Sequence, residues 1–180
     1  MLFAGLNFSL QAGESLLLRG SNGVGKSSML RMMAGLLPCP HGTIERTGRF
    51  ALADENLALD SGKRLMDALS FWVEVEGASR DMLERAMAHY SLTSLADIPV
   101  RMLSTGQRKR AILARTMASD APLWLLDEPG NGLDSASLEA LGAAMTMHLA
   151  QGGAIIAASH FDLPHSFTQT VDLTAQELHP

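Results

Sequence analysis

A glycine-rich stretch near the start of the chain has the residues of a phosphate-binding loop. Two glycines separated by four residues precede a lysine and a serine, and the stretch runs through Gly20, Ser21, Asn22, Gly23, Val24, Gly25, Lys26, Ser27 and Ser28. Glycines let backbone N–H groups approach a phosphate closely, and a helix that begins there adds the positive end of its dipole. Lys26, expected at the surface of the loop, would reach the β- and γ-phosphates, and Ser27 would ligate Mg²⁺. The stretch therefore predicts binding of a nucleoside triphosphate.

The elements that must position this loop lie on either side of it. Residues 15–18 form a short, mostly apolar run typical of a buried strand, and residues 28–37 carry apolar side chains at helical spacing. A strand before the loop and a helix after it are the context that the motif requires. This context argues against the alternative, a glycine-rich turn that matches the motif by accident.

A pair of carboxylates follows a strongly apolar run. Residues 123–126 predict a buried parallel strand, and Asp127 and Glu128 come directly after it. Ligands of open α/β sheets bind at the carboxyl ends of the strands, so Asp127 would hold Mg²⁺ and Glu128 would lie beside the γ-phosphate. The alternative is that the two acids only cap the following turn. His160 follows another apolar run, residues 154–158, and is expected at the same edge of the sheet.

A helix start lies in the middle of the chain. Ser104 and Gln107 have the spacing of a capping box, with Gly106 between them. Arg108, Lys109 and Arg110 place three cations in the first turns of this helix, where they oppose its dipole. The cluster indicates either a neighbouring anion or simply a solvated, charged face.

The remaining pattern predicts further strands and helices. It indicates a half-buried strand at 6–10, short strands at 43–45 and 49–53, helices over 65–72 and 82–90 with a break at Gly77, and a helix from an N-cap at Asp134 to the glycines 152–153. Phe3 or Phe8 could stack on an adenine base, but a core role is the better interpretation for either. Phe71 and Trp72 could form a docking groove for a partner helix, or could pack within the small helical region.

Composition limits the class of partner. The chain has 180 residues, a net charge of −5 and a pI near 5.6, which weigh against nucleic acid as the main partner. Its one cysteine, Cys39, predicts no disulfide and a reducing compartment. No run approaches the roughly 18 apolar residues of a spanning helix, and the start lacks the basic region of a signal peptide, so the chain is expected to stay in the cytoplasm.

Taken together, these motifs resemble the ATP-binding subunit of ABC transporters. The loop at 20–27, the signature at 103–107, the acidic strand end at 123–128, Leu133 with Asp134, and His160 occur in that family's order. More narrowly, residues 104–107, 121–129 and 152–154, the pair Phe71-Trp72 and the short helical region resemble the haem exporter (CcmA) family of bacterial cytochrome c maturation. The resemblance covers nearly the whole chain.

The resemblance implies a fold and a mechanism. The fold is α/β, a P-loop NTPase cassette with a mostly parallel sheet flanked by helices. It forms one ABC domain over residues 1–180, short at its N-terminus, with an inserted helical lobe at about 64–118. Two copies would pack head to tail, each ATP with its Mg²⁺ lying between the loop of one copy and Ser104, Thr105, Gly106, Gln107 and Asp134 of the other. Glu128 would activate water and His160 would contact the γ-phosphate. The partner would be a membrane permease, placing the chain at the cytoplasmic face of the inner membrane.

Several positions depart from the family pattern. Thr105 replaces the first signature glycine and Gly132 replaces the usual alanine before Leu133. Glu55 or Asn56 occupies the place of the glutamine that family members carry between the lobes. Members also begin with one more strand and a base-stacking aromatic, so weak ATP binding is expected.

Three other functions compete with this interpretation, the first of them weakly. A soluble ABC protein of DNA repair or translation would need a long insertion or a second cassette, which 180 residues do not hold. A non-hydrolysing assembly subunit is compatible with the absent glutamine. An ABC ATPase could also energise a permease for a different small molecule.

Overall fold

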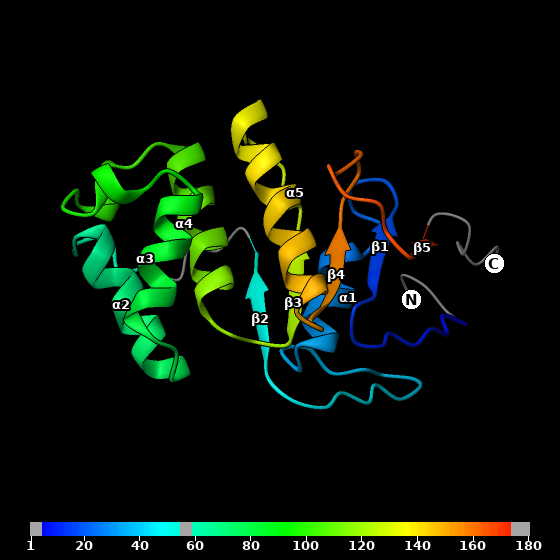
Figure 1. Cartoon of the computed structure of the whole chain (residues 1–180). Helices are drawn as coiled ribbons and strands as arrows, with labels where there is room; N and C mark the ends of the chain where they lie inside the picture. The colour runs from blue at the N-terminus through cyan, green and yellow to red at the C-terminus, as the bar shows by residue number, and fades with distance from the viewer. Residues whose placement is uncertain (1–4, 55–58, 174–180) are drawn as a thin grey trace.

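The core of the fold is a parallel sheet whose strands all end at one edge. The structure, a computed structural model, describes residues 5–54 and 59–173. The strand order is β2-β3-β4-β1-β5, and all neighbouring strands of this sheet pair in parallel. The strands are β1 (Ser15–Arg19), β2 (Phe50–Ala53), β3 (Leu123–Asp127), β4 (Ala154–Ala158) and β5 (Gln169–Asp172). The arrows of β1, β2 and β4 point to the top of the sheet in Figure 1, and parallel pairing places the ends of β3 and β5 at the same edge.

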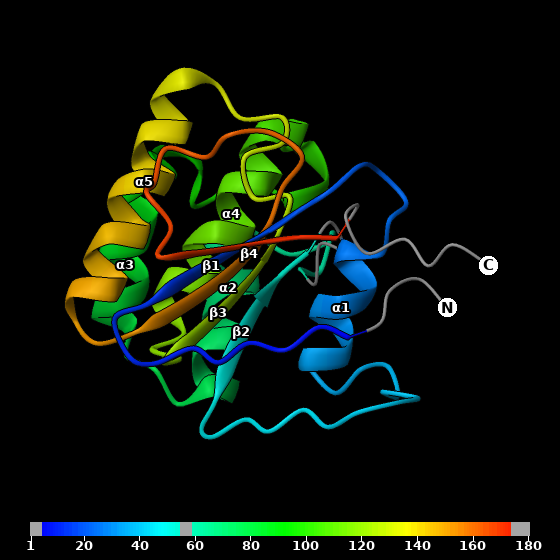
Figure 2. The same cartoon turned by 90° about the vertical axis from the view of Figure 1, so that its right-hand side faces the viewer.

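Helices cover both faces of the sheet and extend beyond one edge of it. The helices are α1 (Lys26–Met33), α2 (Leu65–Glu76), α3 (Arg80–His89), α4 (Thr105–Ala118) and α5 (Ser135–Ala150), with short 3₁₀ turns η1 (Thr93–Leu95) and η2 (Val100–Met102). Figure 2 shows α1 on one face of the sheet and α5 on the other. Helices α2, α3 and α4 form a lobe beside β2 (Figure 1). The predicted fold class is confirmed.

Alternation along the strands divides the core into two parts. Leu16 and Leu18 of β1 pack with Leu30 of α1, whereas Leu17 faces the opposite side. That opposite side continues without interruption into the lobe, because Leu17, Leu65 and Leu83 belong to the same buried cluster. The lobe is therefore fixed to the sheet by a shared apolar core.

Glycines end two of the helices, one at the predicted position and one earlier than predicted. Gly77 ends α2 with φ of +70°, which confirms the predicted break. Helix α1 ends at Met33, four residues before the predicted limit, because Gly35 adopts φ of +74° and turns the chain. Leu36 and Leu37 are consequently exposed.

Two of the predicted strands are wrong. Residues 6–10 alternate in burial because Leu6, Phe8 and Leu10 pack against the α1-side core, and this packing takes place without backbone pairing in the described structure. Within the described ranges these residues form no strand ladder. Residues 43–45 are exposed and irregular, whereas the strand predicted at 49–53 is confirmed as β2. Strand β5 was not predicted from the sequence, and it is only half-buried at the sheet edge.

Candidate nucleotide-binding site

The glycine loop joins β1 to α1 as predicted. Gly23 and Gly25 have φ of +85° and +111°, in the left-handed region that a side chain disfavours. Gly25 is the N-cap of α1, and no side chain among the described residues caps this helix start. The first-turn N–H groups and the positive end of the helix dipole are therefore presented to the loop, which is the arrangement that binds anions. Val24 differs from the glycines in that its side chain is buried in the α1-side core, so only its backbone faces the loop.

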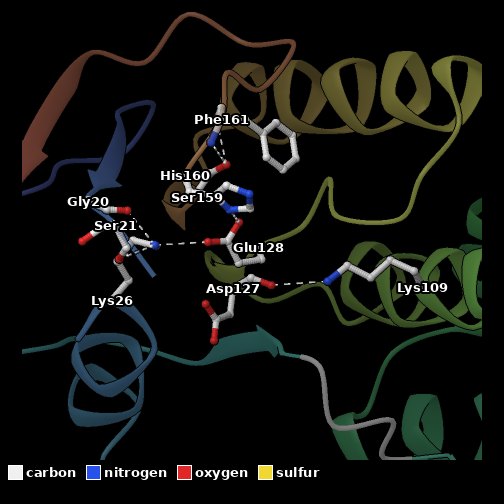
Figure 3. A network of polar contacts seen from close by, with 9 residues as sticks. All are labelled: Gly20, Ser21, Lys26, Lys109, Asp127, Glu128, Ser159, His160 and Phe161. Carbon is white, nitrogen blue, oxygen red and sulfur yellow. Dashed lines mark hydrogen bonds and ion pairs between the residues drawn. The ribbon is translucent and has the colours of Figure 1, made fainter. Parts of the chain in front are cut away.

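Lys26 is buried rather than at the surface, contrary to expectation. Its side chain is 5% exposed, and Nζ donates to the carbonyl oxygens of Gly20 and Ser21 at 2.8 and 3.2 Å. Nζ also lies 3.3 Å from Oε1 of Glu128 (Figure 3). These acceptors offset the cost of burying the ammonium group. The lysine is thus held in the loop and joined to the end of β3.

Glu128 is the junction between three chain segments. Its φ of +46° lies in the left-handed region, which costs a residue with a side chain roughly 1–3 kcal/mol. Its N–H donates to the carbonyl of Ala158 at 2.9 Å, and its Oε2 lies 2.9 Å from His160 Nδ1. The strained turn therefore directs one carboxylate toward Lys26 and His160 together (Figure 3).

The loop that carries His160 is fixed by its neighbours. Ser159 donates its N–H to Leu18 of β1, and its hydroxyl donates to the carbonyl of Phe161 at 2.7 Å. The ring of Phe161 lies edge-on to His160 and also covers Gly130, where an added Cβ would lie 2.9 Å from Cζ of Phe161. The turns after β3 and β4 are therefore interlocked, and they hold Glu128 and His160 in register.

Asp127 has the features of a ligand for a hard cation. It is 6% exposed, and Oδ1 has no hydrogen-bond partner in the described structure. Burial raises the pKa of this carboxyl group, and a hydrogen bond from the Ser27 side chain partly lowers it again. A buried carboxylate oxygen beside a hydroxyl is the pair of oxygen ligands that Mg²⁺ accepts, with water and phosphate oxygens completing its shell. Ser27 and Asp127 thus fit the ion. Among the described residues no group of three or more His, Cys, Asp or Glu could hold a metal.

The predicted capping box at the start of α4 is confirmed. The N–H of Ser104 donates to Oε1 of Gln107 at 2.8 Å, and the N–H of Gln107 donates to Oγ of Ser104 at 3.2 Å. Ser104 and Thr105 are exposed. Gly106 faces the turn after β3, because a Cβ added there would lie 3.4 Å from the carbonyl oxygen of Gly132.

The three cations of α4 do not form the solvated face that was one of their interpretations. Each is partly buried and donates to a backbone carbonyl: Arg108 to Arg101 at 2.9 Å, Lys109 to Asp127 at 3.3 Å, and Arg110 to Tyr90 at 2.9 Å. Local spacing gave no signal for these contacts, because the acceptors lie 7 to 20 residues away in the chain.

The structure separates the predicted residues into two groups. The loop from Gly20 to Ser27, with Asp127, Glu128 and His160, gathers at the carboxyl ends of β1, β3 and β4. The start of α4 lies on the lobe side of the same edge (Figure 1). Between residues 104–107 and 20–27 no hydrogen bond or ion pair occurs in the part of the chain that the structure describes. Asp134 caps α5, accepting from the N–H of Ser137 at 2.8 Å. Phe3, Glu55 and Asn56 lie outside the described residues.

Comparison with known proteins assigns the family. The family model described as ABC transporter matches residues 3–131. The cytochrome c biogenesis ATP-binding export protein CcmA of Sphingopyxis alaskensis is 50% identical over 91% of this chain and 84% of its own length. The protein of that name from Zymomonas mobilis is also 50% identical, over 96% and 78%.

Solved structures agree on the fold. A putative ABC transporter ATP-binding protein from Pyrococcus furiosus superposes with a TM-score of 0.85 at 20% identity, covering 97% of this chain and 91% of that one. An ATP-binding subunit of an ABC transporter gives 0.81 at 24% identity, over 89% and 73%. The chain therefore belongs to the ABC transporter ATP-binding family and, within it, to the family of cytochrome c biogenesis ATP-binding export proteins.

Proposed function

We propose that this chain binds and hydrolyses ATP as the energising subunit of an export system for cytochrome c biogenesis. The observation that carries the proposal is the contact chain from Lys26 through Glu128 to His160, set at the end of a glycine loop. The name of the relatives at 50% identity supports the biological role. The step we assign is haem export, or release of a haem-loaded chaperone, for the assembly of c-type cytochromes.

Each group at the sheet edge has a role in hydrolysis. The N–H groups of the loop and the Lys26 ammonium hold the β- and γ-phosphates. Mg²⁺ held by Ser27 and Asp127 supplies charge neutralisation when bound. Glu128 orients water and accepts its proton as the water attacks the γ-phosphorus. His160 fixes the Glu128 carboxylate through Nδ1, so its other ring nitrogen is left to contact the γ-phosphate. Lys26 contacts Glu128 directly, so a bound γ-phosphate competes with that carboxylate for the lysine.

The start of α4 supports a second copy as partner. It is an exposed helix N-terminus at which Ser104 and Gln107 hydrogen-bond to each other. Within the described residues it makes no hydrogen bond or ion pair to the phosphate loop of its own chain. A helix N-terminus favours an anion. Two copies packed head to tail would therefore place Ser104 to Gln107, and Asp134 nearby, against ATP in the loop of the other copy.

We propose the lobe as the contact for a membrane permease at the cytoplasmic face of the inner membrane. Within the described residues no helix is long and apolar enough to cross a membrane. Phe71 and Val75, one turn apart on α2, are 50% and 62% exposed. Trp72 instead packs against the shared core with the Arg115 guanidinium 4.4 Å from its ring centre, so the core interpretation holds for it. Phe71→Ser with Val75→Ser should weaken co-purification with the permease and leave the melting temperature unchanged; unaltered co-purification would contradict this contact.

A genetic test addresses the biological role. Cells without the gene should lose covalently haem-linked c-type cytochromes on haem-stained gels, and the wild-type chain should restore them while Glu128→Gln should not. Purified wild-type chain should release phosphate from Mg-ATP. Normal cytochromes in the deletion strain would reject the export role, and restoration by Glu128→Gln would support a non-hydrolysing subunit.

A further inference from the structure

The peptide bond just before Glu128 is held from both sides. Its N–H, which belongs to Glu128, donates to Ala158 at the end of β4. Its carbonyl, which belongs to Asp127, accepts from Nζ of Lys109 at 3.3 Å (Figure 3). The residue that follows is in the left-handed conformation, so the orientation of this peptide decides where the Glu128 carboxylate points.

Register explains why a side chain from α4 reaches this carbonyl. Strand β3 pairs with β4 as far as Asp127, but with β2 only as far as Leu126, where β2 ends at Ala53. Asp127 thus extends one residue past the β2 side of the sheet. Lys109 supplies a donor beyond the end of that ladder.

Helix α4 also contacts the chain on the other side of Glu128. Gly106, one turn before Lys109, lies against the carbonyl of Gly132 in the turn that follows Glu128. The first turns of α4 therefore touch the backbone on both sides of this carboxylate. A shift of the helix start would therefore change the support of Glu128.

We propose that Lys109 is a positioning residue that orients Glu128 through the Asp127 carbonyl and so couples the start of α4 to the catalytic carboxylate. This inference rests on the proposed ATPase function. In a head-to-tail pair, the start of α4 binds the ATP of one site while Lys109 supports the carboxylate of the other. Lys109 therefore links the two ATP sites within one chain.

The test compares full-length Lys109→Met with wild type and with Arg85→Met, which removes one exposed cation from α3. Lys109→Met keeps the apolar stem and loses the donor. Its kcat for phosphate release from Mg-ATP should fall about tenfold to a hundredfold, the scale expected for misplacement of a catalytic group. Its Kd for a fluorescent ATP analogue should stay within about twofold, and Arg85→Met should match wild type. Lys109→Arg, which keeps a cationic donor, should recover most of the rate. Wild-type kcat in Lys109→Met would overturn the proposal.

A double variant separates positioning from general structural damage. If Lys109 acts through Glu128, adding Lys109→Met to Glu128→Gln should change the residual rate by less than about twofold, because the group it positions has already lost its function. Multiplicative losses would contradict the proposal. If Lys109→Met fails to fold, Lys109→Gln, one atom too short for the same reach, takes its place. A Glu128→Gln chain as active as wild type would instead reject the proposed function itself.

Discussion

The phosphate loop and the start of α4 are both helix N-termini on the same edge of the sheet, yet they differ in how complete they are. At the loop, Lys26 is 5% exposed and joined to two loop carbonyls and to Glu128. At α4, Ser104 and Thr105 are exposed. The N–H and the hydroxyl oxygen of Ser104 both bond to Gln107 in the same turn. The loop lysine is held by a contact to a residue far away in the chain, whereas the capping hydrogen bonds of Ser104 stay within the first turn of α4.

The difference indicates which half of the ATP site each region supplies. A buried cation with a carboxylate partner is already placed to receive a phosphate and needs no other chain. An exposed helix start with a closed capping box can bind an anion only when a second molecule brings one. Variants at the loop should therefore impair ATP binding and hydrolysis even in a single chain. Variants at the start of α4 should impair them only through the dimer.

The largest effect is expected at the loop. Lys26→Ala should reduce phosphate release to background, because the β- and γ-phosphates lose their cation. The free energy of unfolding should also fall, by about 1–3 kcal/mol, since Glu128 and two carbonyls lose a buried donor. Phosphate release and urea unfolding measure these two effects, with the exposed Lys63→Ala as the charge-matched control. Turnover of Lys26→Ala at the wild-type level would show that the loop takes no part in hydrolysis.

A matched pair at Ser104 should separate helix capping from partner binding. Ser104→Asp keeps a good N-cap but places negative charge at the exposed helix start, so stability should hold while ATP-dependent dimers and hydrolysis fall by roughly tenfold or more. Ser104→Ala loses the cap and should cost about 0.5–2 kcal/mol of stability. Thermal melts and light scattering with Mg-ATP measure both. Normal dimers in Ser104→Asp would show that this helix start does not face a phosphate.

The smallest effect concerns the second exposed cap, Asp134 at the start of α5. Hydrogen bonds from Ser137 lower the pKa of this carboxyl group. A lowered pKa means that the unfolded chain binds the proton more readily, so this contribution is present above pH 3.8 and is lost as pH falls through the folded pKa. Asp134→Asn should therefore have the same free energy of unfolding as wild type at pH 7, because Asn is a comparable N-cap. On acidification the variant should lose less stability than wild type. Identical acid-unfolding curves would show that the cap has no pH dependence.

Local patterns predicted the phosphate loop, the end of β3 and the capping box, because a strand, turn and helix in sequence fix their own geometry. The buried position of Lys26 and the contact of Lys109 with Asp127 depend on residues 102 and 18 positions away, which no local spacing encodes. The alternation at residues 6–10 predicted burial correctly but also implied a strand, and a strand requires backbone pairing with a neighbour, which alternation in the sequence does not encode. Pairing and burial are properties of the assembled sheet.

The central claim, that Glu128 drives hydrolysis in an ATP-bridged dimer, is tested most directly by Glu128→Gln with Mg-ATP. The amide keeps the size of the side chain and removes its basicity, so phosphate release should fall by about 10²–10⁴-fold while ATP still binds. Since hydrolysis is what separates the two copies, the variant should elute as a dimer in size-exclusion chromatography with Mg-ATP and as a monomer without it. A variant that stays monomeric with Mg-ATP and still releases phosphate at the wild-type rate would contradict the account.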